Sequence, residues 1–152
     1  MEIQIRKAVE TDLTVLYGFE QGVIQAERPF DSTLKNDPIH YYDLVEMIAA
    51  PHIYLVVAEF NEQIVGCGYA RIEQAEHFLN HQQHAYLGFM YTVPEFRGRG
   101  VNKKVMDELK GWAKSKNIRE LRLRLYFDNI PARKAYEKVG FSKHMIMMRT
   151  EV

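Results

Sequence analysis

The 152-residue chain has a single cysteine, no excess charge of either sign and no long apolar run. One thiol, Cys67, excludes an intramolecular disulfide framework and a cysteine-cluster metal site. It lies in an apolar stretch, which favours a buried, unreactive thiol over a nucleophile. No stretch approaches the ~18 apolar residues that cross a bilayer, so no membrane partner is expected.

The first nine residues also lack targeting features. They contain neither the apolar core of a signal peptide nor the Arg- and Ser-rich pattern of a transit peptide, so a cytoplasmic location is expected. The composition, 47% hydrophobic and 26% charged, is close to the globular average and indicates a folded chain. This length is typical of one domain, here residues 1–152.

The net charge of zero arises from 20 basic and 20 acidic residues. It argues against a nucleic-acid-binding protein, which usually carries a basic excess. The charges are unevenly distributed, however: residues 1–95 hold 14 acids and 5 bases, and residues 96–152 hold 6 acids and 15 bases. The halves therefore carry −9 and +9. Such asymmetry can mark two partners of opposite charge, although helix surfaces can also divide this way by chance.

The apolar residues alternate between strand and helix periods along the chain. Strands are predicted at residues 3–8, 53–59, 64–72, 85–93, 121–127 and 141–149, and helices at 11–25, 38–48, 99–116 and 129–139. The order predicts an α+β domain with three layers (α/β/α). Its mixed, mostly antiparallel sheet would have about six strands, with four helices. The strand–helix–strand crossover over residues 85–127 predicts two parallel neighbours.

The most informative stretch follows the predicted strand that ends at Pro94. From residue 97 it reads Arg-Gly-Arg-Gly-Val-Asn-Lys and leads directly into a helix. Glycines let the backbone approach a ligand closely, and the first N–H groups of a helix bind anions. Arg97, Arg99 and Lys103 add positive charge, so a phosphate or pyrophosphate is the expected ligand. The spacing matches neither the Walker pattern nor the dinucleotide fingerprint, because Lys103 replaces the third glycine.

Two segments carry a resemblance to a known family. Residues 97–102 resemble the Arg/Gln-x-x-Gly-x-Gly/Ala signature of the GCN5-related N-acetyltransferase (GNAT) superfamily. Residues 129–141 resemble its N-x-x-A-x-x-x-Y-E-K-x-G-F segment, in the family's order and with the family's elements between. The order of elements is similar over essentially the whole chain. The resemblance implies acetyl transfer from acetyl-CoA to a primary amine of a small molecule or peptide. The amine would attack directly, without a covalent enzyme intermediate.

The resemblance also implies which residues bind acetyl-CoA. In the family, the pantetheine arm pairs like an extra strand with the strand before the signature, and the pyrophosphate lies on backbone N–H groups of the signature loop. The implied residues are Met90, Tyr91 and Thr92 for the arm, and Arg97, Gly98, Arg99, Gly100, Val101, Asn102 and Lys103 for the pyrophosphate. The pairing requires a splayed strand, usually with a bulge, and Gly88 weakens the strand nearby. Asn102 departs from the family's Gly or Ala.

Tyr136 lies two helical turns after Asn129 on the same helix face. The resemblance implies that Tyr136 is the acid that protonates the departing thiolate, a role suited to a phenol with a reference pKa near 10. It implies Asn129 as a ligand of the cofactor arm. Without the resemblance, Tyr136 would be an aromatic packing residue and Asn129 simply the N-cap of its helix.

The sequence indicates the general base less clearly than the general acid. Many relatives carry a Glu about eight residues before the signature Pro, where this chain has Tyr86. His84, His81, Glu73 or a water chain could take its place. We predict His84, because the reference pKa of imidazole suits proton removal near neutrality. No histidine pair has the spacing of a zinc enzyme, so no metal is expected.

Two other functions remain open at this point. A non-catalytic acyl-CoA-binding regulator would keep the cofactor loop without a base, and an interaction module would bind no CoA. For the enzyme, a basic acceptor amine is expected, because the acidic half includes the first helices, where relatives build the acceptor pocket. A homodimer is possible, since relatives continue beyond the last predicted strand and a second subunit could complete the sheet.

Overall fold

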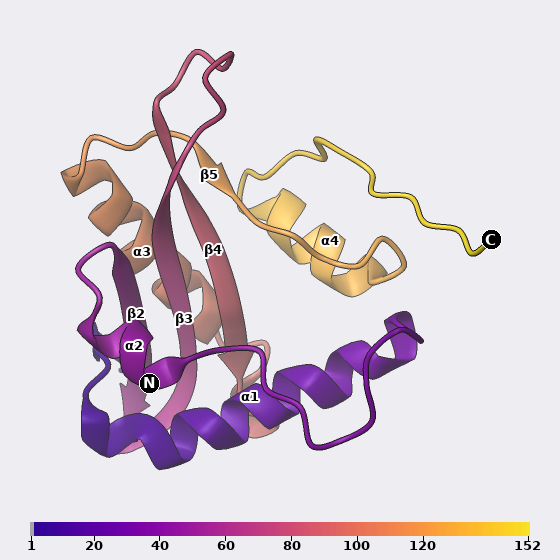
Figure 1. Ribbon diagram of the computed structural model, residues 1–152. Helices are drawn as coiled ribbons and strands as arrows, with labels where there is room; N and C mark the ends of the chain where they lie inside the picture. Colours follow the sequence, from indigo (N-terminus) through magenta and orange to yellow (C-terminus); the bar gives the residue numbers. More distant parts are fainter. Residues whose placement is uncertain (1) are drawn as a thin grey trace.

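The computed structural model describes residues 2–152, in which helices cover both faces of a single sheet (Figure 1). The strands lie side by side in sequence order. They are β1 (Gln4–Lys7), β2 (Ile53–Phe60), β3 (Gln63–Gln74), β4 (Gln83–Thr92) and β5 (Leu121–Arg122). The α-helices are α1 (Leu13–Glu27), α2 (Leu44–Ala49), α3 (Val101–Ser115) and α4 (Ile130–Lys138).

The sheet is antiparallel from β1 to β4, and β4 pairs with β5 in parallel through the α3 crossover. The predicted mixed, mostly antiparallel sheet is confirmed, but it has five strands instead of about six. The prediction of a strand over residues 141–149 is wrong, since within residues 2–152 this stretch joins no ladder. The strand predicted over residues 121–127 shrinks to two residues, because β4 and β5 pair at only two positions.

The second helix also differs from its prediction. It begins at Leu44 and not at Pro38, because Asp43 caps it by accepting a hydrogen bond from the Glu46 backbone N–H at 3.1 Å. The residues before Asp43 are held in a loop by a buried carboxylate, described below. The sequence shows the apolar periodicity of this helix. Where the helix begins, however, also depends on that buried carboxylate, which comes from a distant part of the chain.

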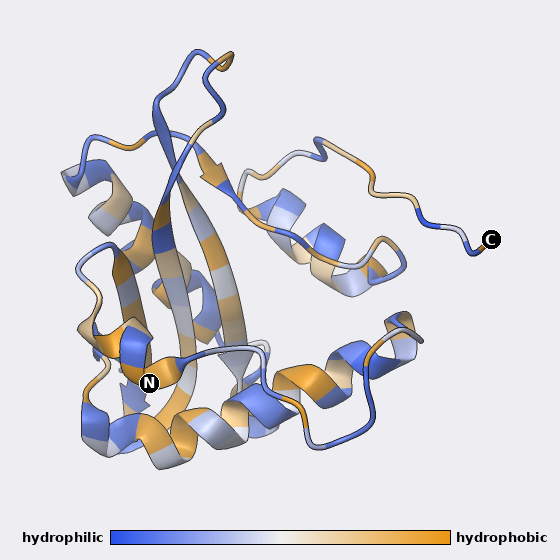
Figure 2. Cartoon of the chain, viewed as in Figure 1, coloured by the Kyte–Doolittle hydropathy of each residue, from blue (hydrophilic) through white to orange (hydrophobic). Residues whose placement is uncertain are grey.

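The sheet separates two apolar clusters. One packs strands against α3, whose Val101, Val105, Leu109 and Ala113 are buried on the face expected from their spacing. The other packs the opposite sheet face against α1 and α2. Figure 2 shows hydrophobic positions alternating with hydrophilic ones along the strands and helices. Each sheet face is therefore covered, as in a three-layer fold.

A β-bulge interrupts β4. Cys67 of β3 lies opposite Tyr91, whereas Tyr69 lies opposite Gly88, so β4 carries one extra residue between these pairs. Phe89 sits in this interval with a positive φ of 54°. The extra residue reverses the side-chain alternation: Leu87 packs in the α3 cluster, and Phe89 packs in the α1 cluster. The bulge required by the family resemblance thus lies at residues 88–90.

Candidate active site

The signature loop forms a turn between β4 and α3. Gly98 and Gly100 have positive φ values of 74° and 84°, a left-handed conformation that costs residues with a Cβ ~1–2 kcal/mol. Gly100 is the N-cap of α3 and supplies no side-chain cap, so the first N–H groups of the helix have no side-chain acceptor at that position. Such a helix start binds phosphate groups.

The three cations of the loop are exposed, but two already contact aromatic rings. Arg97 donates a hydrogen bond to the Thr92 carbonyl at 3.0 Å, and its guanidinium lies 5.7 Å from the Tyr91 ring centroid. Arg99 lies 5.2 Å from the Phe96 ring. Lys103 forms an exposed ion pair with Asp107. Arg97 thus braces the turn against β4, and an anion at the helix start would meet nearby positive charge.

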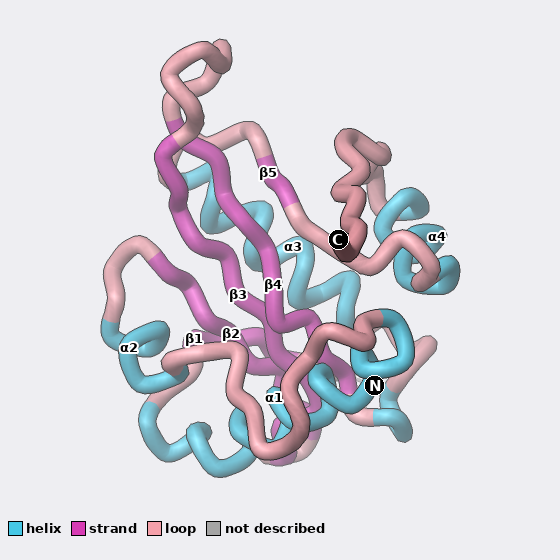
Figure 3. Tube along the Cα trace, turned by 45° about the vertical axis from the view of Figure 1, so that its right-hand side comes forward, coloured by secondary structure: helices cyan, strands magenta, loops and turns pink. Residues whose placement is uncertain are grey.

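The parallel pairing of β4 and β5 is confined to Ala85–Leu121 and Tyr86–Arg122. Beyond these pairs, the segment after β5 separates from β4, as Figure 3 shows, and β4 continues through its bulge to Thr92. One edge of residues 88–92 remains paired with β3. The other edge is turned toward the place where β4 and β5 separate. The backbone of Met90, Tyr91 and Thr92 is therefore placed as an extended arm would need it.

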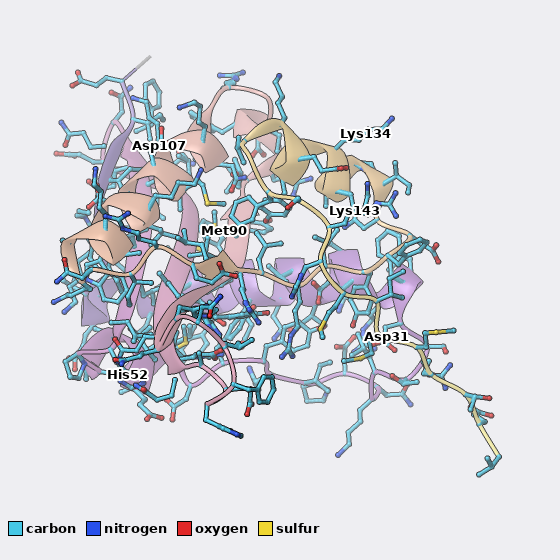
Figure 4. The ribbon with its side chains drawn as sticks, turned by 90° about the horizontal axis from the view of Figure 1, so that it is seen from above. Asp31, His52, Met90, Asp107, Lys134 and Lys143 are labelled. Carbon is cyan, nitrogen blue, oxygen red and sulfur yellow. The ribbon has the colours of Figure 1, made fainter. Side chains whose placement is uncertain are left out.

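The side chains on this part of β4 serve packing. Met90 joins the α3 cluster, and Figure 4 places it in the middle of the molecule. The Tyr91 ring packs 4.7 Å from Phe19 of α1. Val101, at the start of α3, is only 1% exposed. The side chains of these three predicted cofactor residues are thus engaged in packing, which leaves their backbone groups for a ligand.

Tyr136 lies on α4 and packs against the apolar cluster around α3. The centre of its ring is 5.9 Å from that of Phe141. Burial raises the pKa of Tyr136 to about 12, with smaller contributions from Tyr86 and Glu27. The phenol therefore remains protonated at neutral pH and can donate a proton. Asn129 caps α4 by accepting a hydrogen bond from the Ala132 N–H at 3.3 Å, which leaves its side-chain amide N–H groups for another partner.

His84, the predicted base, lies near the start of β4, opposite Glu73 of β3. Its Nε2 is 3.3 Å from a Glu73 carboxylate oxygen, and its Nδ1 is buried without a hydrogen-bond partner. It precedes the two β4–β5 pairs, eight residues before Thr92, which corresponds to about 26 Å along an extended strand. The structure thus places His84 at the paired end of the strands and Met90–Thr92 at the divergent end.

Tyr86, where many relatives carry a Glu, lies between these ends. Its ring is flanked by the guanidinium groups of Arg71 and Arg124, at 5.3 and 5.7 Å from the centroid. Burial raises the pKa of Tyr86, while the two arginines oppose that shift. A phenol in this state is a hydrogen-bond donor at neutral pH, so Tyr86 cannot serve as a carboxylate base does.

A buried carboxylate ties the α1–α2 connection to the body. Glu20 is fully buried and accepts hydrogen bonds from the backbone N–H groups of Tyr41 and Tyr42, each at 2.9 Å. Its other oxygen lies 2.8 Å from Nδ1 of His40. Tyr42 then packs 4.7 Å from Phe89 at the bulge. Glu20 therefore holds this connection beside the bulged strand.

Two further acidic residues, which belong to neither sequence motif, lie at the start of the connection between α1 and α2. Glu27, the last residue of α1, is half-buried, and burial raises its pKa. Its charge contributes to the raised pKa values of Tyr42, Tyr86, Tyr126 and Tyr136, so its carboxylate lies within electrostatic range of these phenols. Asp31 accepts a hydrogen bond from Tyr126 at 2.6 Å, and bonds from Thr33 and Tyr126 lower its pKa to about 2.

The remaining predictions concern a nucleophile and metals. Cys67 is fully buried, and burial raises its pKa well above the usual value, as expected of an inert thiol. Among residues 2–152, the structure groups no three His, Cys, Asp or Glu side chains in a way that could hold a metal ion. No helix in this same range is both long and apolar enough to cross a membrane.

The chain matches the model of the acetyltransferase (GNAT) family over residues 21–141. The uncharacterized N-acetyltransferase YycN of Bacillus subtilis strain 168 is 31% identical to it over 121 residues, which are 79% of this chain and 75% of YycN. Among solved structures, a predicted acetyltransferase with acetyl-CoA from Clostridium acetobutylicum superposes with a TM-score of 0.74 at 21% identity. That match covers 99% of this chain and 96% of the other.

A second solved structure is an aminoglycoside acetyltransferase. AAC(6')-Iy, in complex with a bisubstrate analogue of CoA and acetylneamine, superposes with a TM-score of 0.75 at 21% identity over the full length of both chains. At this identity the likeness shows a common fold.

The match to the family model and the match to YycN thus define the class of this protein, an acyl-CoA-dependent acyltransferase. The chain belongs to the GNAT family of acetyltransferases. Its predicted fold class and its predicted activity, transfer of an acetyl group from acetyl-CoA to amines, are confirmed. The roles of the individual site residues stay predictions.

Proposed function

We propose that this N-acetyltransferase acts on a primary amine that arrives as a cation. The observation that supports it is a pair of acidic residues: Asp31 accepts a hydrogen bond from Tyr126, and the charge of Glu27 contributes to the raised pKa values of Tyr126 and Tyr136. An ammonium group would be attracted to this side, while the CoA phosphates would meet the basic α3 loop. AAC(6')-Iy was solved in complex with a bisubstrate analogue that contains acetylneamine, which is consistent with a basic amine as the acceptor.

In the proposed reaction, the amine first loses a proton and its nitrogen then attacks the thioester carbonyl carbon. The carbon–sulfur bond breaks, and the phenol of Tyr136 gives its proton to the departing thiolate. The nitrogen releases its second proton as the amide forms, and this proton restores the phenol. Because burial raises the pKa of Tyr136 to about 12, the phenol still carries its proton at neutral pH when the thiolate forms. Met90, Tyr91 and Thr92 would pair with the pantetheine arm, with Asn129 as a further partner of it. The Arg97–Lys103 loop would hold the pyrophosphate.

Two groups compete for the proton of the acceptor ammonium. His84 remains the proposed base because an imidazole can accept a proton; it lies at the paired end of β4 and β5, whereas Met90–Thr92 lie at the divergent end. Glu27 is the second candidate, because its burial-raised pKa and its position among the phenols favour proton uptake. The variants His84→Gln and Glu27→Gln distinguish them: the base is the residue whose replacement removes the acidic limb of the pH profile of kcat/KM.

The function itself is tested in two measurements. Calorimetric titration with acetyl-CoA should show binding below about 1 mM, the upper end of ordinary KM values. Thiol release should then be measured with polyamines, aminoglycosides, amino acids and peptide N-termini, and we expect the cationic amines to react fastest. Binding without turnover would instead indicate the acyl-CoA-binding regulator, and no binding would overturn the proposal.

The proposal includes two further points. The enzyme would act in the cytoplasm, because its donor, acetyl-CoA, is a metabolite made inside cells. It would also act as a homodimer, since the residues after α4 expose an apolar run that a second copy could cover.

A further inference from the structure

The ring of Tyr86 is contacted by two guanidinium groups, which come from the chain segments on either side of β4. In the sheet, β4 lies between β3 and β5 (Figure 1). Arg71 of β3 is the register partner of Tyr86, and its guanidinium carbon lies 5.3 Å from the centre of the tyrosine ring. Arg124 follows β5, and its guanidinium carbon lies 5.7 Å from the same centre. Two positive charges are thus held beside one phenol.

The two arginines differ in the anions that they already contact. Arg71 donates two hydrogen bonds to one oxygen of Glu73, from Nε at 3.0 Å and from Nη2 at 2.7 Å. Arg124 is exposed, and no carboxylate in the described part of the chain lies within ion-pairing distance of it. Its neighbour Arg122, by contrast, pairs with Glu120 at 3.1 Å. The guanidinium of Arg124 therefore keeps its N–H groups for another acceptor.

The charges and donors beside Tyr86 suit a carboxylate. Arg71, Arg124 and Glu73 together carry one net positive charge, which a monoanion neutralises and a doubly charged phosphate exceeds. The planar guanidinium group matches the geometry of a carboxylate. Tyr86 adds a hydrogen-bond donor, because burial holds the pKa of its phenol above the usual value. The three side chains thus offer both the donors and the charge that bind one carboxylate.

These side chains lie beside the proposed acceptor side of the site. Burial raises the pKa of Tyr136, and the charge of Tyr86 contributes to this shift. Burial also raises the pKa of Tyr86, and the charge of Glu27 adds to that shift. Because charges in solution act over about 10 Å at 0.1 M salt, Tyr86 lies near both the proposed acid and Glu27. An anion at Tyr86 and an amine at Tyr136 can therefore belong to one small molecule.

We propose that Arg71, Arg124 and Tyr86 bind a carboxylate of the acceptor, so that the substrate carries both a primary amine and a carboxylate, as amino acids and short peptides do. The role of this site rests on the proposed acetylation of a cationic amine, and it narrows the class of acceptor. The ammonium group is attracted to Glu27 and Asp31, and the carboxylate to the two arginines. Each charge of the acceptor thus meets its opposite, which orients the amine toward the thioester.

Matched acceptors test the carboxylate site. Glycine, β-alanine, lysine and diglycine are each compared with the corresponding primary amide, which keeps the amine and lacks the negative charge. For the best of them, kcat/KM should exceed that of its amide about tenfold, the effect of one charge-assisted hydrogen bond. Phosphoethanolamine, compared with ethanolamine, should show a smaller preference. Equal rates for every carboxylate and its amide, or a larger preference for the phosphate ester, would overturn the proposal.

Variants assign the preference to the guanidinium groups. Arg124→Gln removes the exposed one, so the ratio of kcat/KM between carboxylate and amide should fall from about tenfold to about twofold or less. Tyr86→Phe keeps the ring and removes one donor, and should lower the ratio by a smaller factor. The matched control is Arg122→Gln, two residues before Arg124, which loses only the pair with Glu120 and should keep the ratio. An unchanged ratio in Arg124→Gln contradicts the carboxylate site.

Binding measurements separate the carboxylate site from the proposed acetylation. The dissociation constants of each carboxylate and its amide are measured by calorimetry with CoA present. Turnover without a preference for the carboxylate, in kcat/KM and in the dissociation constant, contradicts only the carboxylate site. A preference of about tenfold in the dissociation constant without turnover contradicts only the acetylation. If none of these amines binds or reacts, both are contradicted.

Discussion

The two proposed sides of the site, one for acetyl-CoA and one for the acceptor amine, are built in different ways. The cofactor side, residues 88–103, is one continuous stretch that offers backbone groups and a helix start. The acceptor side, comprising Glu27, Asp31, Tyr86 and Tyr126, gathers side chains from distant parts of the chain. Its hydrogen bond between Tyr126 and Asp31 joins residues 95 positions apart. A ligand held by backbone leaves a readable motif, whereas a ligand held by assembled side chains does not.

The largest expected effect is at Tyr136, the proposed acid. Tyr136→Phe removes the acid but keeps the ring that packs against Phe141, so kcat should fall by about 10²-fold, the lower end for general acid catalysis. The dissociation constant of acetyl-CoA should change less than about twofold. Steady-state kinetics and titration calorimetry measure the two quantities, with Tyr17→Phe on α1 as the control. Unchanged turnover would remove the proposed acid role.

A change confined to the cofactor side should affect acetyl-CoA alone. Ala at position 100 is strained at φ 84°, and avoiding this strain turns the loop away from the anion. At about 1–2 kcal/mol, Gly100→Ala should weaken acetyl-CoA binding about tenfold. Gly111→Ala is the control: it lies on the exposed side of the same helix with open space around it, and should raise Tm by about 2–4 °C without affecting binding.

A change confined to the acceptor side should leave acetyl-CoA binding intact. Glu27→Gln removes one half-buried charge, and we expect the KM of a cationic amine to rise about fivefold, the size of a charge pair worth about 1 kcal/mol. The KM of acetyl-CoA should stay constant. Glu62→Gln, in the exposed turn between β2 and β3, is the control. Equal effects on both KM values would mean that the two sides are not separate.

The smallest effect concerns pH. Burial raises the pKa of Tyr136 from 10 to about 12, so the folded protein retains this proton longer than the unfolded chain. Its contribution to stability is complete below pH 10 and is lost as the pH rises toward 12. In the same way, kcat should show no fall between pH 7 and 10 from loss of the acid. A pH profile of kcat and urea unfolding at pH 9, 10 and 11 check both statements.

Much of the fold was predictable because its signals are local. The α3 face of Val101, Val105, Leu109 and Ala113 follows from helical spacing, and a glycine, Gly140 with a φ of 104°, follows the end of α4. The missing sixth strand was not predictable from its apolar pattern. A strand needs a paired neighbour, and for residues 141–149 the structure supplies none among residues 2–152.

The sequence alone determined the order of the elements, the left-handed glycines before α3 and the phenol at position 136, because each depends on residues that are close in the chain. Only the tertiary structure decided the bulge at Phe89, the divergence of β4 from β5 and the place of Glu27 among the tyrosines. The role of Glu20 also depends on the tertiary structure, because it requires the backbone N–H groups of Tyr41 and Tyr42 to lie beside its carboxylate. Register, burial and charge contacts are properties of neighbours in space, and a contiguous motif does not contain them.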